Sequence, residues 1–163
     1  MLNYKLYARE CIVKVITYKE SKQFIDTYHL QGNTIDKIRL GLFYNNELVS
    51  VMTFGKSRFN KNETELIRYC VKNDYQIIGG ASKLFNYFIN NYNYNKIISY
   101  AEADISNGNL YDILGFKYIG ISENFKWLYR GIRYNRLNQV KDKNKDLIYK
   151  CYSSGILKYE YTH

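Results

Sequence analysis

The sequence predicts an α/β fold in which helices flank a mixed, mostly antiparallel central sheet. A β-hairpin pattern occupies residues 37–54, several other short runs are rich in β-branched and aromatic residues, and two segments repeat apolar residues at helical spacing. The chain has 163 residues, of which 46% are hydrophobic, so it is long enough to form one domain with a substantial core.

The first strand and the first helix are expected in the N-terminal fifth of the chain. Residues 11–18 (CIVKVITY) alternate and are rich in β-branched side chains, which indicates a strand. Residues 19–30 place apolar side chains at helical spacing, at Phe24, Ile25 and Tyr28, and a glycine follows as a stop signal.

The hairpin is the clearest unit of the sequence. Two alternating runs in residues 37–54 flank Asn45 and Asn46, and asparagine tolerates the positive φ that a tight hairpin turn needs. Residues 55–63 form a polar loop, and residues 64–71 (TELIRYCV) are a third run of strand type.

The middle of the chain alternates between helix and strand. Residues 72–80 are expected as loop and turn, and the next segment has one apolar helical face. A nearly continuous apolar start to residues 96–103 (KIISYAEA) favours a central strand. A short helix then ends at Gly115. The two helices are expected at residues 81–92 and 107–116.

The C-terminal part is predicted to continue the sheet. Residues 117–122 and 125–131 alternate as strands, and residues 147–161 are compatible with a terminal hairpin. We therefore expect one domain over residues 1–131, with residues 132–163 as a basic extension packed on the same domain.

Positive charge gathers at the C-terminal end. The net charge is +9, and from Lys126 to the C-terminus nine basic residues stand against three acidic ones, or +6 of that total. Aromatic residues interleave with this charge, which is typical of a surface for phosphates and stacked bases. DNA is therefore an expected partner of the basic C-terminal region, although the same alternation also fits a plain sheet. The interleaved aromatic residues are Trp127, Tyr129, Tyr134, Tyr149 and Tyr152.

Several classes of protein are disfavoured. No apolar run approaches the length of a membrane span, and no signal-peptide pattern opens the chain. Cys11, Cys70 and Cys151 are odd in number and far apart, which fits neither a disulfide framework nor a metal site, and two histidines add no ligand spacing. We expect no metal, no membrane and a cytoplasmic location.

Two adjacent glycines, Gly79 and Gly80, stand directly before a predicted helix. They either make a plain turn between two elements or expose the backbone so that a phosphate can approach it. A helix N-terminus after a bare turn offers free N–H groups and a positive dipole end, which suits phosphate.

Residues 76–81 fit the pattern Q/R-x-x-G-x-G/A and so resemble the pyrophosphate loop of the GNAT superfamily of N-acetyltransferases. The later helix "LYDILGF" and the order of elements over about residues 10–130 are similar to that superfamily. The resemblance implies that strand 66–71 splays from strand 96–102 and that the pantetheine arm of an acyl-CoA lies in the gap. It also implies that the pyrophosphate loop includes Gln76 and that the pyrophosphate is cradled by the amides of Gly79, Gly80, Ala81, Ser82 and Lys83.

The segments "GLFYNNELVSVMTFGKSRFN", "GGASKLFNYFI" and "YKCYSSGILKYEY" look like a phage-borne GNAT-like module. That module occurs alone or with homing-endonuclease-type proteins and is related to the phage Mom DNA-modification proteins. Its functional candidates fall on Arg68, Ser82 and Glu102. Glu102 stands where the group usually has Asp, and Ala103 and Asp104 replace its usual basic pair.

The candidate acid and bases each have a simpler interpretation. Tyr111 stands where many acetyltransferases keep the general acid for the departing CoA thiolate, but it could equally be one tyrosine of the core. Glu102 and Asp104 follow a central strand, where open α/β sheets bind ligands, and either could deprotonate an amine. Both could also be solvated loop acids.

Four further residues have open roles. Arg68 lies in an apolar strand, where a charge needs a ligand or an ion pair with Glu102 or Glu65. Ser82 is most simply a helix N-cap. His29 is a base, a substrate contact or a histidine at a helix C-terminus. Cys70 is interpreted as a buried strand residue rather than an acyl acceptor.

The sequence therefore predicts a transferase that uses acetyl-CoA or another acyl-CoA and modifies an amine of a nucleic-acid base or nucleotide in phage DNA modification. Strand amides near Tyr69, Cys70 and Val71 would stabilise the oxyanion. Two alternatives stay open. One is an acetyltransferase for a small-molecule or protein amine, and the other is a non-catalytic DNA-binding module.

Overall fold

A computed structural model describes residues 4–57, 59–135 and 148–162. Its strands are β1 (Tyr4–Tyr7), β2 (Ile12–Val15), β3 (Ile38–Tyr44), β4 (Glu47–Lys56), β5 (Thr64–Val71), β6 (Tyr75–Ile78), β7 (Ile97–Glu102), β8 (Lys117–Ser122), β9 (Phe125–Tyr129), β10 (Ile132–Asn135), β11 (Ile148–Tyr152) and β12 (Ile156–Tyr161). Its helices are α1 (Tyr18–Tyr28), α2 (Gly80–Asn91), α3 (Asn109–Ile113) and the 3-10 turn η1 (Ala8–Glu10).

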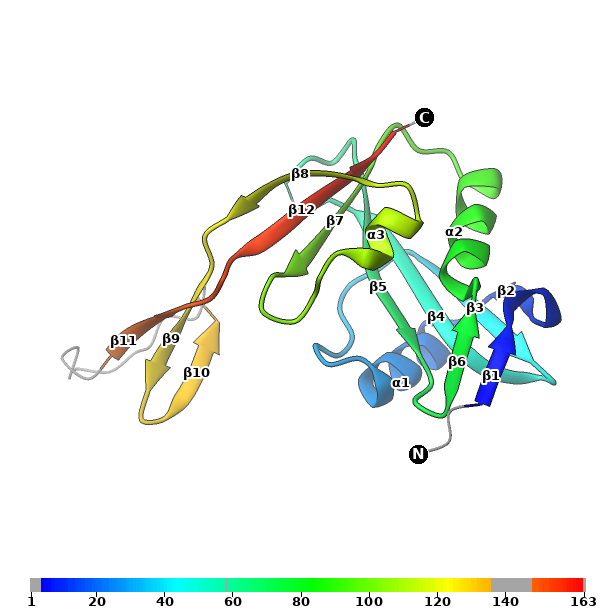
Figure 1. Ribbon diagram of the computed structural model, residues 1–163, viewed down its shortest axis with the longest axis horizontal. Helices are drawn as coiled ribbons and strands as arrows, with labels where there is room; N and C mark the ends of the chain where they lie inside the picture. The colour runs from blue at the N-terminus through cyan, green and yellow to red at the C-terminus, as the bar shows by residue number, and fades with distance from the viewer. Residues whose placement is uncertain (1–3, 58, 136–147, 163) are drawn as a thin grey trace.

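Seven strands form the central sheet in the order β2-β3-β4-β5-β7-β12-β8 (Figure 1). Each neighbouring pair is antiparallel except β5 and β7, which run parallel. The predicted mixed and mostly antiparallel sheet is confirmed. The predicted hairpin is β3 and β4, and Asn45 and Asn46 both have positive φ, at 47° and 64°, as a type I′ turn requires.

The sequence prediction missed one parallel strand pair. Residues 75–78, which were expected as loop, form β6 and pair with β1 from Tyr4–Tyr75 to Tyr7–Ile78. Two strands of four residues carry too little alternation to stand out in a sequence. This pair leads straight into Gly79, so the two glycines follow a strand rather than a loop.

The first predicted strand is shorter than expected because a helix cap interrupts it. The Thr17 side chain accepts a hydrogen bond from the Glu20 amide at 3.3 Å, and the Glu20 carboxylate accepts one from the Thr17 amide at 2.8 Å. This capping box starts α1 at Tyr18 and ends β2 at Val15.

The terminal hairpin that residues 147–161 suggested is wrong. β11 pairs with β9 in a separate three-stranded sheet, whereas β12 inserts between β7 and β8 in the central sheet. Gly155, with φ at 110°, stands where the chain passes from one sheet to the other. The C-terminal extension therefore contributes an interior strand of the main sheet.

The two longer helices cover opposite faces of the sheet (Figure 1). α1 packs Phe24 and Ile25 against a small apolar cluster, and α2 packs on the larger one. The ring of Phe88 on α2 stacks on the ring of Phe54 on β4 with centroids 3.7 Å apart, and Tyr92, the C-cap of α2, stacks on Phe88 at 5.3 Å. This stack fixes α2, and with it the glycine turn at its start, against β4.

We expect Phe88→Ala to lower the free energy of unfolding by about 3–5 kcal/mol, because Phe88 is 1% exposed and its removal leaves a cavity beside Phe54. Denaturant unfolding measures this loss. Exposed Ile113→Ala on α3 is the control and should change stability by less than about 0.5 kcal/mol. Equal effects of the two substitutions would contradict this packing of α2.

Candidate active site

The central sheet opens between β5 and β7. The two strands pair only at Thr64–Ile97 and Glu65–Ile98, their first two positions, and then separate toward their C-terminal ends. A cavity of about 340 Å³ lies in this opening, and β5, β7, α3 and the segment after α1 contribute its walls. Its lining residues are His29, Leu30, Gln31, Leu66, Ile67, Arg68, Tyr69, Tyr100, Ala101, Glu102, Ile105, Ser106, Leu110 and Tyr111.

Ser99 sits at the point where the two strands part. Its hydroxyl lies 2.8 Å from the Leu66 carbonyl oxygen and 3.1 Å from the Tyr111 hydroxyl. A serine has one hydroxyl proton, and the shorter contact to the carbonyl takes it. Tyr111 then gives its one proton to the Ser99 oxygen, and the Tyr100 carbonyl lies farther from the same hydroxyl, at 3.4 Å.

Tyr111 keeps its proton at neutral pH. Its side chain is 7% exposed, and burial raises the pKa of its hydroxyl above the ordinary value. The ring stacks on Tyr159 of β12, with centroids 4.2 Å apart and planes 13° apart. Tyr111 is therefore both a core tyrosine and a protonated hydroxyl at the cavity wall, so the two interpretations offered by the sequence are compatible.

The segment after α1 closes the other side of the cavity. Arg68 of β5 donates from Nε to the Gly32 carbonyl at 3.0 Å and from a terminal nitrogen to the Ile67 carbonyl at 3.0 Å. Gln31 reaches across and donates from Nε2 to the Glu102 carboxylate at 3.0 Å. Arg68 and Gln31 thus hold the segment against β5 and against the end of β7.

His29 is the C-cap residue of α1 and also lines the cavity. Its Nδ1 accepts a hydrogen bond from the Gln31 amide at 3.1 Å. Burial lowers the pKa of the imidazole below 6.5, and the nearby Arg68 charge lowers it further. A neutral imidazole that accepts at Nδ1 carries its proton on Nε2, so this side chain presents a donor rather than a base.

Gly79 and Gly80 both have steric reasons to be glycine. Gly79 is the N-cap of α2 with φ at 75°, the left-handed region. A Cβ on Gly80 would lie 2.9 Å from the Ile77 side chain and 3.4 Å from the Tyr69 hydroxyl. Tyr69 also lines the cavity, so it joins the opened sheet to the start of α2.

The first turn of α2 differs in two respects from the prediction. The Lys83 amide, expected in the pyrophosphate cradle, donates to the Gly79 carbonyl at 2.9 Å and is therefore taken up by the helix. The N-cap interpretation of Ser82 is wrong, because Gly79 is the N-cap and Ser82 is the third helical residue, half-buried. Lys83 uses its side chain to tie η1 to the helix, donating from Nζ to the carbonyls of Ala8 at 2.8 Å and Cys11 at 2.6 Å. Ala81 is half-buried against the core.

Five other residues discussed from the sequence do not line the cavity. Asp104 accepts a hydrogen bond from the Ser154 amide at 2.9 Å, so it anchors the chain before β12. Cys70 packs on the α1 side, where burial raises the pKa of its thiol to about 12, so it is not a nucleophile at neutral pH. Gln76 is exposed on β6, Val71 ends β5, and Glu65 is buried where β5 and β7 still pair.

Two polar residues of this site were not anticipated. Gln31 meets Glu102, which is 71 positions away, and nothing in a single sequence reveals such a contact. Ser99 had a usable signal, because a serine inside the apolar run "IISYA" needs a hydrogen-bond partner when the strand is buried.

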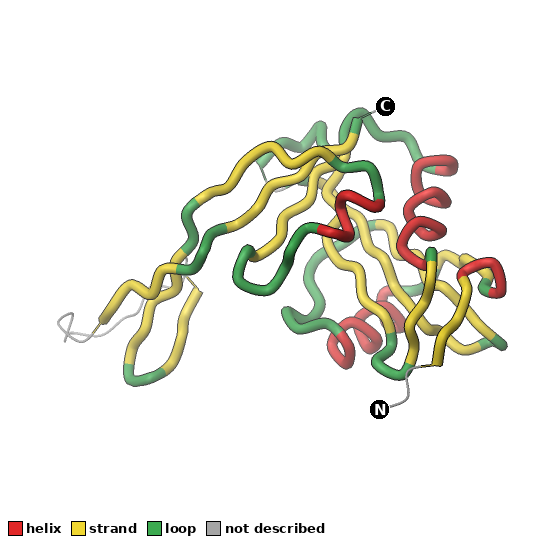
Figure 2. Tube along the Cα trace, in the orientation of Figure 1, coloured by secondary structure: helices red, strands yellow, loops and turns green. Residues whose placement is uncertain are grey.

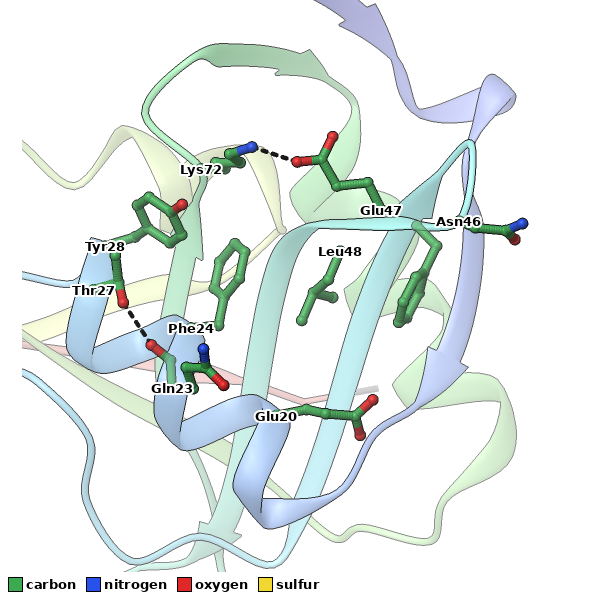
Figure 3. Close-up of a pocket in the computed structure, with 10 residues that line it drawn as sticks. Glu20, Gln23, Phe24, Thr27, Tyr28, Asn46, Glu47, Leu48 and Lys72 are labelled. Carbon is green, nitrogen blue, oxygen red and sulfur yellow. Dashed lines mark hydrogen bonds and ion pairs between the residues drawn. The ribbon is translucent and has the colours of Figure 1, made fainter.

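A second cavity of about 350 Å³ lies between α1 and the β3–β4 turn (Figure 3). Lys72 and Glu47 form an ion pair at its rim. None of the site residues predicted from the sequence lines it. In the part of the chain that the structure describes, no cluster of three or more His, Cys, Asp or Glu could hold a metal ion, and no helix has the length and apolar character to cross a membrane.

Solved acetyltransferase structures superpose on nearly the whole chain. An acetyltransferase of Bacillus subtilis in complex with CoA matches with a TM-score of 0.61 at 14% identity, over 94% of this chain and 99% of that chain. The ribosomal-protein-S18-alanine N-acetyltransferase of Escherichia coli matches with a TM-score of 0.60 at 13% identity, over 92% of each chain. A GNAT family acetyltransferase of Elizabethkingia anophelis with acetyl-CoA bound matches with a TM-score of 0.56 at 18% identity, over 94% of this chain and 99% of that chain.

No protein-family model matches the sequence, and no curated protein matches it. At such low identity the structural matches establish the fold, and the chain has the α/β GNAT fold with a mostly antiparallel seven-stranded sheet. The GNAT-like fold predicted from the sequence is confirmed.

The burial of His29 and the nearby Arg68 charge predict a pH effect. The unfolded chain binds a proton at His29 near pH 6.5, and the folded chain binds it only at lower pH. His29 therefore costs no stability above pH 6.5, and the free energy of unfolding falls as the pH drops from 6.5 toward the folded pKa. We expect His29→Asn to flatten this fall, as denaturant unfolding at a series of pH values would show.

The effect of the Arg68 charge on His29 can be measured by NMR titration. Arg68→Gln should raise the pKa of His29 toward 6.5 because it removes the second cause of the shift. Arg9→Gln, on the exposed surface, is the matched control and should leave that pKa unchanged. An unchanged His29 pKa in Arg68→Gln would place the arginine away from the imidazole.

Proposed function

We propose that the protein is an acyl-CoA-dependent N-acyltransferase that works in the opening between β5 and β7. The observation that carries the proposal is that the two strands part after two paired residues and enclose a cavity. Tyr69 lines this cavity, and its hydroxyl lies 3.4 Å from where a Cβ on Gly80, the first residue of α2, would stand. Two of the similar structures hold CoA or acetyl-CoA, which supports an acyl-CoA as the donor for this chain.

The residues at the start of α2 fit a pyrophosphate. The first N–H groups of a helix have no acceptor inside the helix, and the helix dipole makes this end positive. Gly79 and Gly80 add no side chains over these groups, and the first turn contains no acidic residue. Gly80, Ala81 and Ser82 would therefore hold the pyrophosphate through their amides, with Tyr69 leading toward the cavity.

An acyl-CoA, when bound, supplies the activated acyl group as a thioester. Tyr111 holds a proton at its hydroxyl, at the cavity wall, and can give it to a thiolate. Glu102 is the carboxylate that lines the cavity, so it is the stronger of the two candidate bases for the acceptor amine. Gln31 orients this carboxylate, and the backbone near Tyr69 on the freed side of β5 can donate to an oxyanion.

The acceptor we propose is an amine of a nucleic-acid base or nucleotide, in a reaction of the phage Mom type. The net charge of +9, concentrated after Lys126, supports this choice because it attracts polyanions. We also propose a host-cytoplasmic location, which agrees with the free state of Cys11, Cys70 and Cys151.

Two alternatives lead to different outcomes. A small-molecule or protein amine as acceptor is favoured by the Escherichia coli neighbour, whose name states that it acetylates an alanine of a ribosomal protein. Turnover without DNA would separate this case from the first. A non-catalytic DNA-binding module would bind DNA with no affinity for acyl-CoA.

Ser82→Glu tests the pyrophosphate site without harming the helix. A carboxylate in the first turn stabilises a helix by about 0.3–1 kcal/mol, but it would repel a pyrophosphate bound to the same amides. We expect calorimetric titration to show at least about tenfold weaker acetyl-CoA binding by Ser82→Glu, and nearly unchanged binding by the uncharged control Ser82→Gln. Equal affinity of the two variants for acetyl-CoA would show that the pyrophosphate does not bind at the start of α2.

Tyr111→Phe and Glu102→Gln test the acid and the base. Each substitution removes a proton-transfer group, so we expect kcat to fall by roughly 10²-fold or more while acetyl-CoA affinity changes little. The readout is nucleoside mass spectrometry of DNA from cells that express the protein or either variant. Unmodified DNA, together with turnover on a free amine in vitro, would favour the small-molecule alternative.

A further inference from the structure

β9, β10 and β11 form a three-stranded sheet that projects from the body of the protein, shown in Figures 1 and 2. We call its described residues, 125–135 and 148–152, the arm. It continues the β8–β12 ladder, because the Ser153 amide donates to the Asn124 carbonyl at 2.9 Å where the two ladders meet. Arg130 and Gly131, with φ at 48° and 76°, make a tight type I′ turn at its far end.

The strand register sorts the arm's side chains onto two faces. Residues directly opposite one another in antiparallel strands share a face. Trp127 lies opposite both Tyr134 and Lys150, and Phe125 lies opposite Tyr152. These five residues therefore share one face, which we call the aromatic face. The other face carries Lys126, Leu128, Tyr149 and Cys151.

Ring contacts confirm that the aromatic face is continuous. Phe125 meets Trp127 edge to face at 5.2 Å and Tyr152 at 6.0 Å. The Lys150 ammonium lies 5.0 Å from the Phe125 ring centre and 5.4 Å from the Trp127 ring centre. Tyr152 is 64% exposed, and Phe125 and Trp127 are half-buried, so open ring surface and a positive charge lie side by side.

Charge on the arm is of one sign. Its described residues include Lys126, Arg130, Arg133 and Lys150 and no acidic residue, and the intervening residues 136–147 add four basic and two acidic residues. Phe125 and Trp127, two residues apart on β9, have ring centroids 5.2 Å apart and planes at 84°, so they offer bases of a single strand two adjacent ring surfaces turned in different directions. The bases of a duplex are stacked on one another and cannot use these rings.

We propose that the aromatic face of the arm binds single-stranded nucleic acid, with bases stacked on Phe125, Trp127 and Tyr152 and phosphates near Lys150. The purpose of this binding rests on the proposed function, in which the acceptor is an amine of a nucleic acid. The arm begins beside the cavity, since Lys126, on the face opposite the aromatic face, has its ammonium 4.0 Å from the Glu102 carboxylate, which lines the cavity.

Anisotropy titration of a fluorescent 12-nucleotide single strand tests the proposal, with its duplex as the second probe. Tyr152→Ala should weaken binding of the single strand by roughly 5- to 100-fold, the usual effect of losing one stacked base. Tyr149→Ala is the matched control, because the same residue type stands on the same strand, similarly exposed at 61%, but on the opposite face. It should leave the affinity unchanged.

Lys150→Gln should reduce the slope of log affinity against log salt by about 0.7, as one lost phosphate contact does for a single strand. Equal losses in Tyr149→Ala and Tyr152→Ala, or equal affinity for the duplex, would overturn the proposal. Binding to anionic phospholipid vesicles without binding to the oligonucleotide would overturn it in favour of a membrane surface.

Titration of the same variants with acetyl-CoA separates this proposal from the proposed function. We expect Tyr152→Ala to bind acetyl-CoA like the unmodified protein. Loss of oligonucleotide binding with normal acetyl-CoA binding supports the arm as a separate nucleic-acid surface. Single-strand binding that needs Tyr152, in a protein with no affinity for acetyl-CoA, would support the arm and refute the transferase.

Discussion

The parting of β5 and β7 is the constraint on which the rest of the structure depends. These strands form the only parallel pair of the seven-stranded sheet, and their ladder ends after two residues on each. Beyond that point backbone groups of both strands lose a partner strand, and such groups need other partners or a ligand. Ser99 supplies one replacement by bonding to the Leu66 carbonyl, and the space beyond it is the cavity.

The surrounding elements keep this opening in place from three sides. On one face the Phe54–Phe88 stack holds α2, so the glycine turn stays at the edge of the opening. Behind the opening, β12 pairs with β7 along its whole length and stacks Tyr159 on Tyr111. On the third side Arg68 holds the segment after α1, which brings Gln31 to Glu102. A charge in an apolar strand is thus explained by its contacts with backbone carbonyls.

Local sequence patterns predicted much of the fold, whereas strand pairings between distant parts of the chain could not be predicted. The hairpin at Asn45 and Asn46, the helix after Gly80 and the mixed sheet all follow from turn chemistry and periodicity, which act over a few residues. The insertion of β12 depends on partners at least 34 positions away on β8 and at least 54 positions away on β7. The β1–β6 pair consists of strands too short to show a pattern. The site divides in the same way. Glu102 could be proposed from its place at the end of a central strand, and Tyr111 from the resemblance of its segment to acetyltransferases, whereas the contact of Gln31 with Glu102 needed the fold.

The most direct test of the account is backbone NMR of the labelled protein during titration with acetyl-CoA. If the opening holds acyl-CoA, amide signals should shift saturably at the start of α2, residues 79–83, and at Leu66–Val71 on β5 and Ser99–Glu102 on β7. The amide signals of residues that line the cavity between α1 and the β3–β4 turn should not shift. Shifts confined to that second cavity, or no shifts in a folded protein, would contradict the claim that the opened sheet is an acyl-CoA site.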